Sequence, residues 1–330
     1  MYYAKFCFVG VAGSNIKGCE AMQKVSYKLH ILALSAVYVL SGAVITLPKP
    51  VTEGGSLPAL LTAFLFSLIF LLAVYKIASK LENVSGKSKL LKLLYIILAI
   101  SCFLDSAMIF SEVADFVDLI MLPDQKKYMS VILLFVCVFW ISLNKISAVM
   151  KFSVPIFFFA VITVLLFFFL SLKQMKFENI ELKGSVFKKS VLKEALYYFF
   201  KIFLPLINLC AFVFMFKKEK NKAKYSFAGV LTGSVLIFVC VFQIISVFGG
   251  ALTADIEFPY SAVISTVNIG NIFTRMDGAA YFLFIGIFLV RTGTDLKVIS
   301  DIAKNLGIKS KMLTSVISSL VITAAAVAIF

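Results

Sequence analysis

Long apolar runs alternate with short polar segments along nearly the whole chain. Most runs hold about 20 apolar residues, enough for a helix to cross the roughly 30 Å hydrocarbon core of a bilayer. Short polar loops between runs predict that sequential helices pack as antiparallel neighbours. We predict nine membrane-spanning helices, at residues 29–47, 57–77, 90–120, 128–143, 152–172, 195–216, 226–248, 277–297 and 312–330.

The unbroken character of these runs decides the fold class. A chain in lipid must satisfy its own backbone hydrogen bonds, which restricts it to helices or a closed barrel. Barrel strands are short and alternate apolar with polar residues, a pattern that is missing here. Composition agrees, because 61% of the residues are hydrophobic, against about 45–50% in soluble domains. The sequence therefore predicts an all-α polytopic membrane protein.

The residue pattern at the two ends of the chain differs from that of the rest. Residues 1–21 have scattered glycines and no sustained period, so we interpret them as an N-terminal extension, with Met22 as the expected true start. Residues 22–330 form one predicted transmembrane domain. Its last apolar segment ends at Phe330 without a flanking charge, and we expect that the chain stops early there.

The formal net charge of +15 is explained by topology. The cations lie in loops that flank the membrane, and no basic, aromatic-interleaved patch suggests nucleic-acid binding. Cytoplasmic loops of membrane proteins are rich in Lys and Arg, and the loops after the second, sixth and eighth helices are the lysine-rich ones, with the loop after the fifth helix as the exception. We therefore predict a cytoplasmic N-terminus. The lysines of the three loops are Lys76, Lys80, Lys87, Lys89 and Lys92; Lys217, Lys218, Lys220, Lys222 and Lys224; and Lys297, Lys304, Lys309 and Lys311.

Little in the sequence supports enzymatic chemistry. His30 is the only histidine, so a Ser–His site or a histidine-ligated metal site has nothing to build on. The six cysteines show no CxxC spacing, and we interpret them as buried thiols that pack like small hydrophobes. We expect a protein that is not an enzyme, with no cofactor, no metal and no catalytic residues.

Two predicted helices are interrupted. Ser41-Gly42-Ala43 lies within the first helix, which Pro48 closes, and Pro205, followed by Asn208, lies within the sixth. Glycine and proline weaken or end helices. If five helices make one repeat, helices one and six correspond, and paired interruptions of this kind indicate a ligand site near the midplane of a transporter fold. The alternative is that these are ordinary residues of membrane helices, where Gly and Pro are common.

Asp105 lies near the middle of the third predicted helix. Acidic residues cost about 2.5–3.5 kcal/mol at a helix centre on insertion scales. Asp105 is therefore a candidate partner for an ammonium group or a candidate proton site, and a structural role stays open. Three acids further along this helix are expected to mark its solvated outer end: Glu112, Asp115 and Asp118.

Two further patterns concern packing and charge balance. Gly229-x-x-x-Gly233 in the seventh helix is typical of close helix–helix packing. Arg291 and Asp295 are four residues apart in the eighth helix, and we interpret them as a neutralising pair near the inner interface.

Three stretches of the chain resemble one protein family. The most specific combines Phe258-Pro259-Tyr260-Ser261 with Ile269-Gly270-Asn271-Ile272-Phe273 and Arg275-Met276-Asp277 before the eighth helix. The others are Ser41-Gly42-Ala43-Val44-Ile45-Thr46-Leu47-Pro48 and Ser111-Glu112-Val113-Ala114-Asp115-Phe116. Together they resemble the spore germination permease family, the GerAB- and GerKB-like B subunits of nutrient germinant receptors.

The resemblance implies a LeuT-like fold of the amino acid–polyamine–organocation superfamily, with inverted repeats at about 27–172 and 195–330. The second repeat is incomplete, because the family usually has ten helices. Ser111 also stands where an Arg is usual. Such a subunit sits in the spore inner membrane or cell membrane with A and C subunits, and senses a small nutrient, often an amino acid. The alternative is a secondary amino acid transporter coupled to a proton or cation.

The resemblance also implies two sets of site residues. Those facing the ligand at the unwound helices are Ser41, Gly42, Ala43, Val44 and Ile45, opposite Phe203, Leu204, Pro205 and Asn208. The family-signature positions, expected to serve gating or subunit contact, are Pro259, Gly270, Asn271, Arg275 and Asp277.

Overall fold

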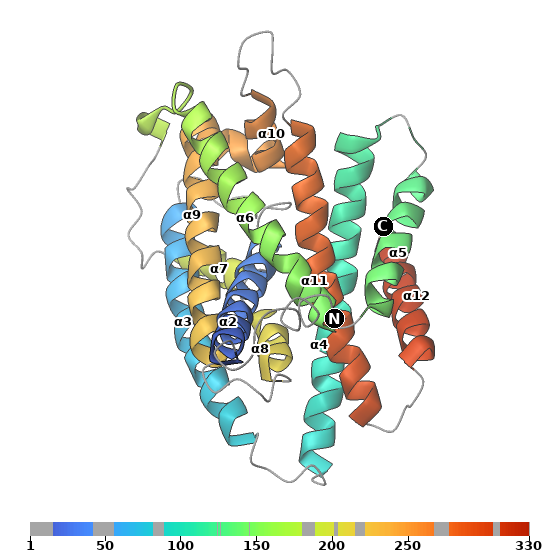
Figure 1. Cartoon of the computed structure of the whole chain (residues 1–330). Coiled ribbons are helices and arrows are strands. Elements are labelled where there is room, and N and C mark those ends of the chain that lie inside the picture. The colour runs from blue at the N-terminus through green and yellow to red at the C-terminus, as the bar shows by residue number, and fades with distance from the viewer. Residues whose placement is uncertain are drawn as a thin grey trace.

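The computed structural model describes residues 16–41, 56–81, 89–123, 125, 127–144, 146–179, 189–200, 204–214, 222–266, 277–305 and 311–329. Within these ranges every regular element is a helix (Figure 1). The helices run in chain order as α2 Ile16–Ser41, α3 Ser56–Leu81, α4 Lys89–Phe116, α5 Lys127–Leu143, α6 Ile146–Ser171, α7 Lys189–Tyr198, α8 Leu206–Phe214, α9 Lys222–Asp255, α10 Pro259–Thr266, α11 Asp277–Asn305 and α12 Lys311–Ile329. A π-helical turn, η1, continues α4 over Val117–Met121, and a 3-10 turn, η2, spans Phe177–Asn179.

Each apolar run predicted from the sequence contains a helix, with three differences. α2 begins at Ile16, inside the range assigned to an extension. The run at 195–216 holds two helices, α7 and α8, instead of one. The short helix α10 was not predicted, because its eight residues are too few for a span and follow Pro259, a good first residue for a helix.

Helix length and surface composition both indicate a membrane environment. In the described part of the chain four helical segments are long and apolar enough to cross a bilayer: Pro58–Lys76, Tyr95–Met121, Ser147–Ser171 and Lys222–Gly249. Large apolar side chains also lie exposed on the outside of the bundle, among them Trp140 at 68% and Phe169 at 64%. Water-soluble proteins rarely leave contiguous faces of this kind uncovered, so these faces fit contact with lipid.

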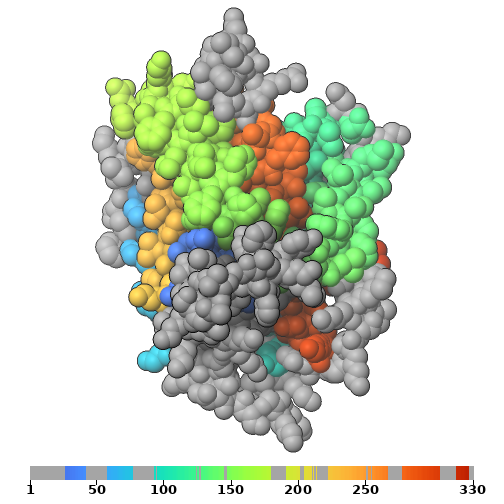
Figure 2. Space-filling model, viewed as in Figure 1, coloured from blue at the N-terminus to red at the C-terminus, as the bar shows by residue number. Residues whose placement is uncertain are grey.

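Helix α2 lies at the centre of the bundle. Its residues from Ala33 to Ser41 are all buried, and it packs against α6, α8, α11 and most extensively α9. In Figure 2, α6 covers the front of the bundle and only a small patch of α2 shows between α6 and α9. Polar side chains of this buried segment, such as Ser35 and Tyr38, therefore find their hydrogen-bond partners inside the bundle.

Two glycines of α9 allow α2 to approach closely. A Cβ at Gly229 would lie 2.3 Å from the Leu32 carbonyl oxygen, and one at Gly233 would lie 2.6 Å from that of Ala36. Ser35 and Ser226 form a hydrogen bond of 2.9 Å across the same interface. Close packing at Gly229-x-x-x-Gly233 is therefore confirmed, and α2 is its partner.

Helix α9 is kinked at Gly249. This residue has φ +76° and ψ 164°, outside the helical region and in a part of conformational space that favours glycine. The carbonyl of Ser246, three residues earlier, accepts hydrogen bonds from the backbone N–H of Lys176 at 2.8 Å and from the side-chain amide of Asn179 at 3.1 Å. The segment containing η2 thus satisfies the backbone at the kink.

Replacing Gly233 by leucine should separate α2 from α9, because the new side chain meets backbone that cannot move aside. Overpacking of this kind costs about 1–3 kcal/mol or more. We expect a lower melting temperature or loss of folded protein, measured by fluorescence-detected size exclusion after heating in detergent.

Gly278→Ala is the matched control, because a Cβ at Gly278 meets nothing within 4 Å. Equal melting temperatures for Gly233→Leu and the control variant would contradict the close packing.

Candidate functional site

Two separate helices, α7 and α8, stand where one was predicted, and Pro205 and Asn208 lie at the start of the second. α7 ends at Tyr198 and α8 begins at Leu206, directly after Pro205. The N–H of Leu204 reaches back to the carbonyl of Phe199 at 2.8 Å, and the N–H of Asn208 donates to the carbonyl of Pro205 at 2.9 Å. Proline has no N–H and disfavours a helix running through it. The predicted interruption of the sixth helix is therefore confirmed.

Asn208 lies in the first turn of α8 and is fully buried. Its Oδ1 accepts a hydrogen bond of 3.0 Å from the Ser101 hydroxyl on α4. Its Nδ2 is buried and has no hydrogen-bond partner among the described residues. A buried polar group left without a partner costs about 1–3 kcal/mol. The described residues therefore leave this buried donor unsatisfied.

A polar cluster lies between α2, α4 and α11, in the interior of an otherwise apolar bundle. α11 packs against both α2 and α4, so that the three helices bring their polar side chains together. The cluster is formed by Tyr38, Ser41, Asp105, Ser106, Arg291 and Asp295.

Arg291 is the cation of this cluster, and its side chain is 2% exposed. Its guanidinium binds Asp105 through two contacts, Nη2 to Oδ1 at 2.5 Å and Nε to Oδ2 at 3.0 Å. Nη1 donates to the Ser41 hydroxyl at 3.1 Å, and the guanidinium lies over the Tyr38 ring at 5.0 Å from its centroid. A planar, two-point ion pair is the geometry for which Arg is suited. One residue thus connects α2, α4 and α11.

Asp295 has different neighbours. Its Oδ1 accepts a hydrogen bond from the Tyr38 hydroxyl at 2.8 Å, and its Oδ2 accepts one from Ser106 at 3.3 Å. The sequence predicted an ion pair between Arg291 and Asp295 of the same helix. That prediction is wrong, because the ion-paired acid is Asp105 on α4. The long arginine side chain reaches sideways to α4, where both oxygens of Asp105 meet the guanidinium, a contact that spacing along α11 could not reveal.

The cluster lies close to the end of α2 and to the start of α8. Ser41, the last described residue of α2, donates to the Tyr38 carbonyl at 2.6 Å and accepts from Arg291. Ser101, the partner of Asn208, precedes Asp105 by four residues, so the two lie on one face of α4. The end of α2 therefore contacts the charged cluster directly, and the start of α8 contacts α4 one helical turn away from it.

Comparison with known families identifies the chain. A family model described as spore germination protein, the spore permease model, matches residues 27–329. The chain belongs to this family. No curated protein matches it. The family and the apolar helices together make it a multi-pass membrane protein with a role linked to spore germination.

Some signature positions of this spore germination permease are described. Pro259 is the first residue of α10 and is buried. Asp277 begins α11, and its Oδ1 accepts the N–H of Gly278 at 2.9 Å, as a cap of its own helix. Both residues stand at the beginning of a helix. Their expected part in gating or subunit contact stays a prediction.

Other predicted site residues lie outside the described part of the permease, so that their roles remain predictions. These are Gly42, Ala43, Val44 and Ile45 after α2, Phe203 between α7 and α8, and Gly270, Asn271 and Arg275 before α11. Leu204, by contrast, is described, and lies half-buried in the turn before Pro205.

Sequence reasoning found Asp105 but missed that Tyr38 and Asp295 share its site. Tyr38 stands within an apolar run and has no charged neighbour in sequence. The available signal was Ser41 three residues later and Asp295 four residues after Arg291, since each pair lies on one helix face. Which faces meet is decided by packing alone.

Removing the cation should damage the permease more than removing its partner acid. Arg291→Gln leaves the Asp105 carboxylate without its counter-charge, and breaking a buried ion pair costs about 3–5 kcal/mol. Asp105→Asn leaves Arg291 close to Asp295, and should therefore cost less. Thermal melting of both purified variants in detergent measures the difference.

Arg291→Lys, which keeps the charge but loses the two-point geometry, should fall between the other two. A Gln variant that melts with the wild type would contradict the role given to the guanidinium.

Proposed function

We propose that this permease is the membrane subunit of a spore nutrient-germinant receptor that senses a small nutrient, such as an amino acid, at the interrupted helices. The observation that carries the proposal is the buried Nδ2 of Asn208, a donor with no partner among the described residues, in the first turn of α8 directly after Pro205. Ligand sites on folds of this type lie where helices are broken near the midplane.

The chemistry at the break suits the carboxylate of an amino acid. An amide N–H₂ donates to carboxylate oxygens, and the N-terminal end of α8 adds a partial positive charge from the aligned peptide dipoles. The amide or the helix dipole alone would contribute little to the binding of a carboxylate. Together they favour an anionic group over a cationic one at Asn208.

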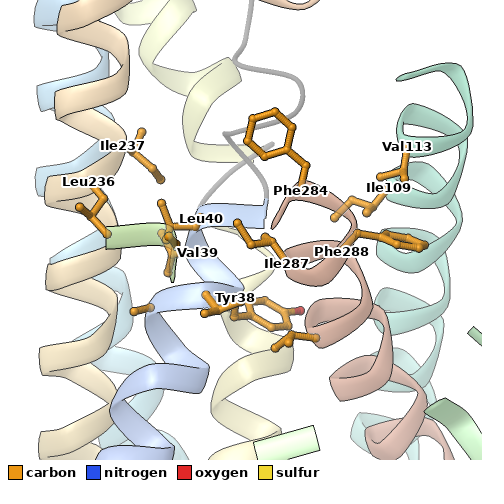
Figure 3. Packing of buried hydrophobic residues seen from close by; sticks show 14 of the residues in the cluster. Tyr38, Val39, Leu40, Ile109, Val113, Leu236, Ile237, Phe284, Ile287 and Phe288 are labelled. Atoms are coloured by element: carbon orange, nitrogen blue, oxygen red, sulfur yellow. The ribbon is translucent and has the colours of Figure 1, made fainter. Parts of the chain in front are cut away.

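The surrounding side chains favour a small or aliphatic nutrient. Val39 and Leu40 end the apolar part of α2, between Ile287 of α11 and Leu236 and Ile237 of α9 (Figure 3). Such surroundings add apolar contact for a side chain of the ligand. The proposed ligand-facing residues remain Ser41 to Ile45 opposite Phe203 to Pro205 and Asn208.

The remaining features of the proposal rest on family membership and loop charge. We propose that the subunit sits in the spore inner membrane with A and C subunits, with its N-terminus in the cytoplasm. We also propose that repeats at about 27–172 and 195–330 are related by inversion. The interruption between α7 and α8 supports this, because it falls where the second repeat would match the end of α2 at Ser41.

A second candidate function is secondary transport of an amino acid coupled to a proton or cation. The observation in its favour is the buried acid pair Asp105 and Asp295 beside the proposed ligand site. Acidic residues within the membrane are expensive and frequently serve proton or ion pathways. The fold alone does not separate sensing from transport.

Asn208→Leu should weaken the response to the nutrient. A hydrogen bond to a charged group contributes about 1.5–3 kcal/mol, which corresponds to roughly tenfold to more than a hundredfold in affinity. We expect spores carrying this variant to need at least about tenfold more nutrient for half-maximal germination, measured as loss of optical density across a concentration series.

Asn144→Leu is the matched control, because within the described ranges the exposed Asn144 side chain donates to the carbonyl of Trp140, four residues earlier. Immunoblots of spore membranes check that both variants are present at wild-type levels. An unchanged concentration dependence for Asn208→Leu would remove the ligand site from this break.

Vesicles containing the purified permease separate the two functions. We expect no uptake of labelled amino acids under an imposed proton gradient, together with germination blocked in a deletion strain. Uptake that is abolished by Asp105→Asn would instead establish transport and displace the sensor proposal.

A further inference from the structure

The polar cluster holds more negative than positive charge. Its charged groups are Asp105, Asp295 and Arg291, so two carboxylates face one guanidinium. The ionisable groups around the buried Asp295 carboxylate are Asp105 on α4, and Arg291 and Tyr38; Cys102 of α4 is near enough to interact electrostatically with both acids. None of these supplies a second positive charge, and all six side chains of the cluster are at least half-buried.

The Tyr38 hydroxyl lies within hydrogen-bond distance of both acids but has too few hydrogens for both contacts. The Tyr38 oxygen lies 2.8 Å from Oδ1 of Asp295 and 3.3 Å from Oδ2 of Asp105. A hydroxyl group has a single hydrogen, so it can donate to one of these carboxylates and not to both. If Asp295 carries a proton, it donates to the Tyr38 oxygen while Tyr38 donates to Asp105, and each contact then contains a hydrogen.

We propose that the Asp105–Asp295 pair binds one proton, carried by Asp295 and shared through the Tyr38 hydroxyl. The step forms an O–H bond on Asp295 from a proton of the solvent and leaves the cluster electrically neutral. Two carboxylates that share a site do not both ionise readily. The proton lies on Asp295 because Asp105 has both oxygens on the guanidinium, whereas Asp295 receives only neutral hydroxyl groups.

The site selects a proton over a metal cation. A hard cation such as Ca²⁺ or Mg²⁺ takes about six or more oxygen ligands, whereas each oxygen of Asp295 already faces a hydroxyl group of the protein. The Arg291 guanidinium lies in the same cluster and repels a second fixed cation. No group of three or more His, Cys, Asp or Glu in the described ranges has metal-binding geometry.

The proton is placed where it affects the end of α2. Loss of the proton from Asp295 would draw the guanidinium toward a second carboxylate. That movement weakens the contact of Nη1 with Ser41, the last described residue of α2. Protonation of the cluster and the conformation of this helix end are therefore linked, and a ligand that changes one changes the other by the same free energy.

Infrared difference spectroscopy of the purified full-length permease tests the proton directly. Protonated carboxylic acids have a carbonyl stretch well separated from that of carboxylates, and solvated acids are ionised at mildly alkaline pH. We expect the wild type to retain one such band under these conditions, with a shift in D₂O. A wild-type spectrum without the band overturns the proposal, whatever the variants do.

The variants assign the band. Asp295→Asn should abolish it. Asp105→Asn should abolish it as well, because one carboxylate then balances Arg291. Tyr38→Phe should shift it by removing its hydrogen-bond acceptor, and Asp301→Asn, on the same helix outside the cluster, should leave it unchanged. Persistence of the band in either of the first two variants, or its loss on adding sodium ions, overturns the proposal.

Discussion

The ion pair between Arg291 and Asp105 is the interaction on which the interior of this permease depends. A guanidinium with 2% of its side chain exposed can persist in a lipid-embedded bundle only beside an opposite charge. The pair joins α4 to α11, and the third arm of the guanidinium reaches Ser41 on α2. These three helices are therefore held in one register by a group that tolerates little displacement. Dispersion contacts alone would leave such helices free to slide.

Close packing of α2 completes this arrangement. Gly229 and Gly233 let the backbone of α9 approach that of α2 nearly to contact. In a membrane, association depends on such packing because lipid is as apolar as the side chains. α2 is consequently held on one side by glycine contacts and on the other by Arg291. Its end at Ser41 is thus held by helix packing and by a contact that belongs to the charged cluster.

The start of α8, the end of α2 and the charged cluster lie close together. Asn208 at the start of α8 contacts Ser101 of α4, one helical turn from Asp105, while Ser41 contacts Arg291 directly. The proposed ligand site at Asn208 therefore lies near the charged cluster. This proximity gives a sensor a physical route from a bound nutrient to a helix rearrangement, and would give a transporter a route from nutrient to coupled proton.

The sequence by itself determined the class of the protein and the places where its helices could not continue. Apolar runs of bilayer length leave a chain no other fold, Pro205 falls at the interruption between α7 and α8, and the glycine spacing of α9 marks a contact face. It also marked Asp105 as costly in lipid. Only the tertiary structure decided that Arg291 binds Asp105 instead of Asp295, and that Tyr38 stands between the two acids. Charge and periodicity fix which face of a helix is polar, whereas the rotation and depth of one helix against another come from the packing of all of them at once.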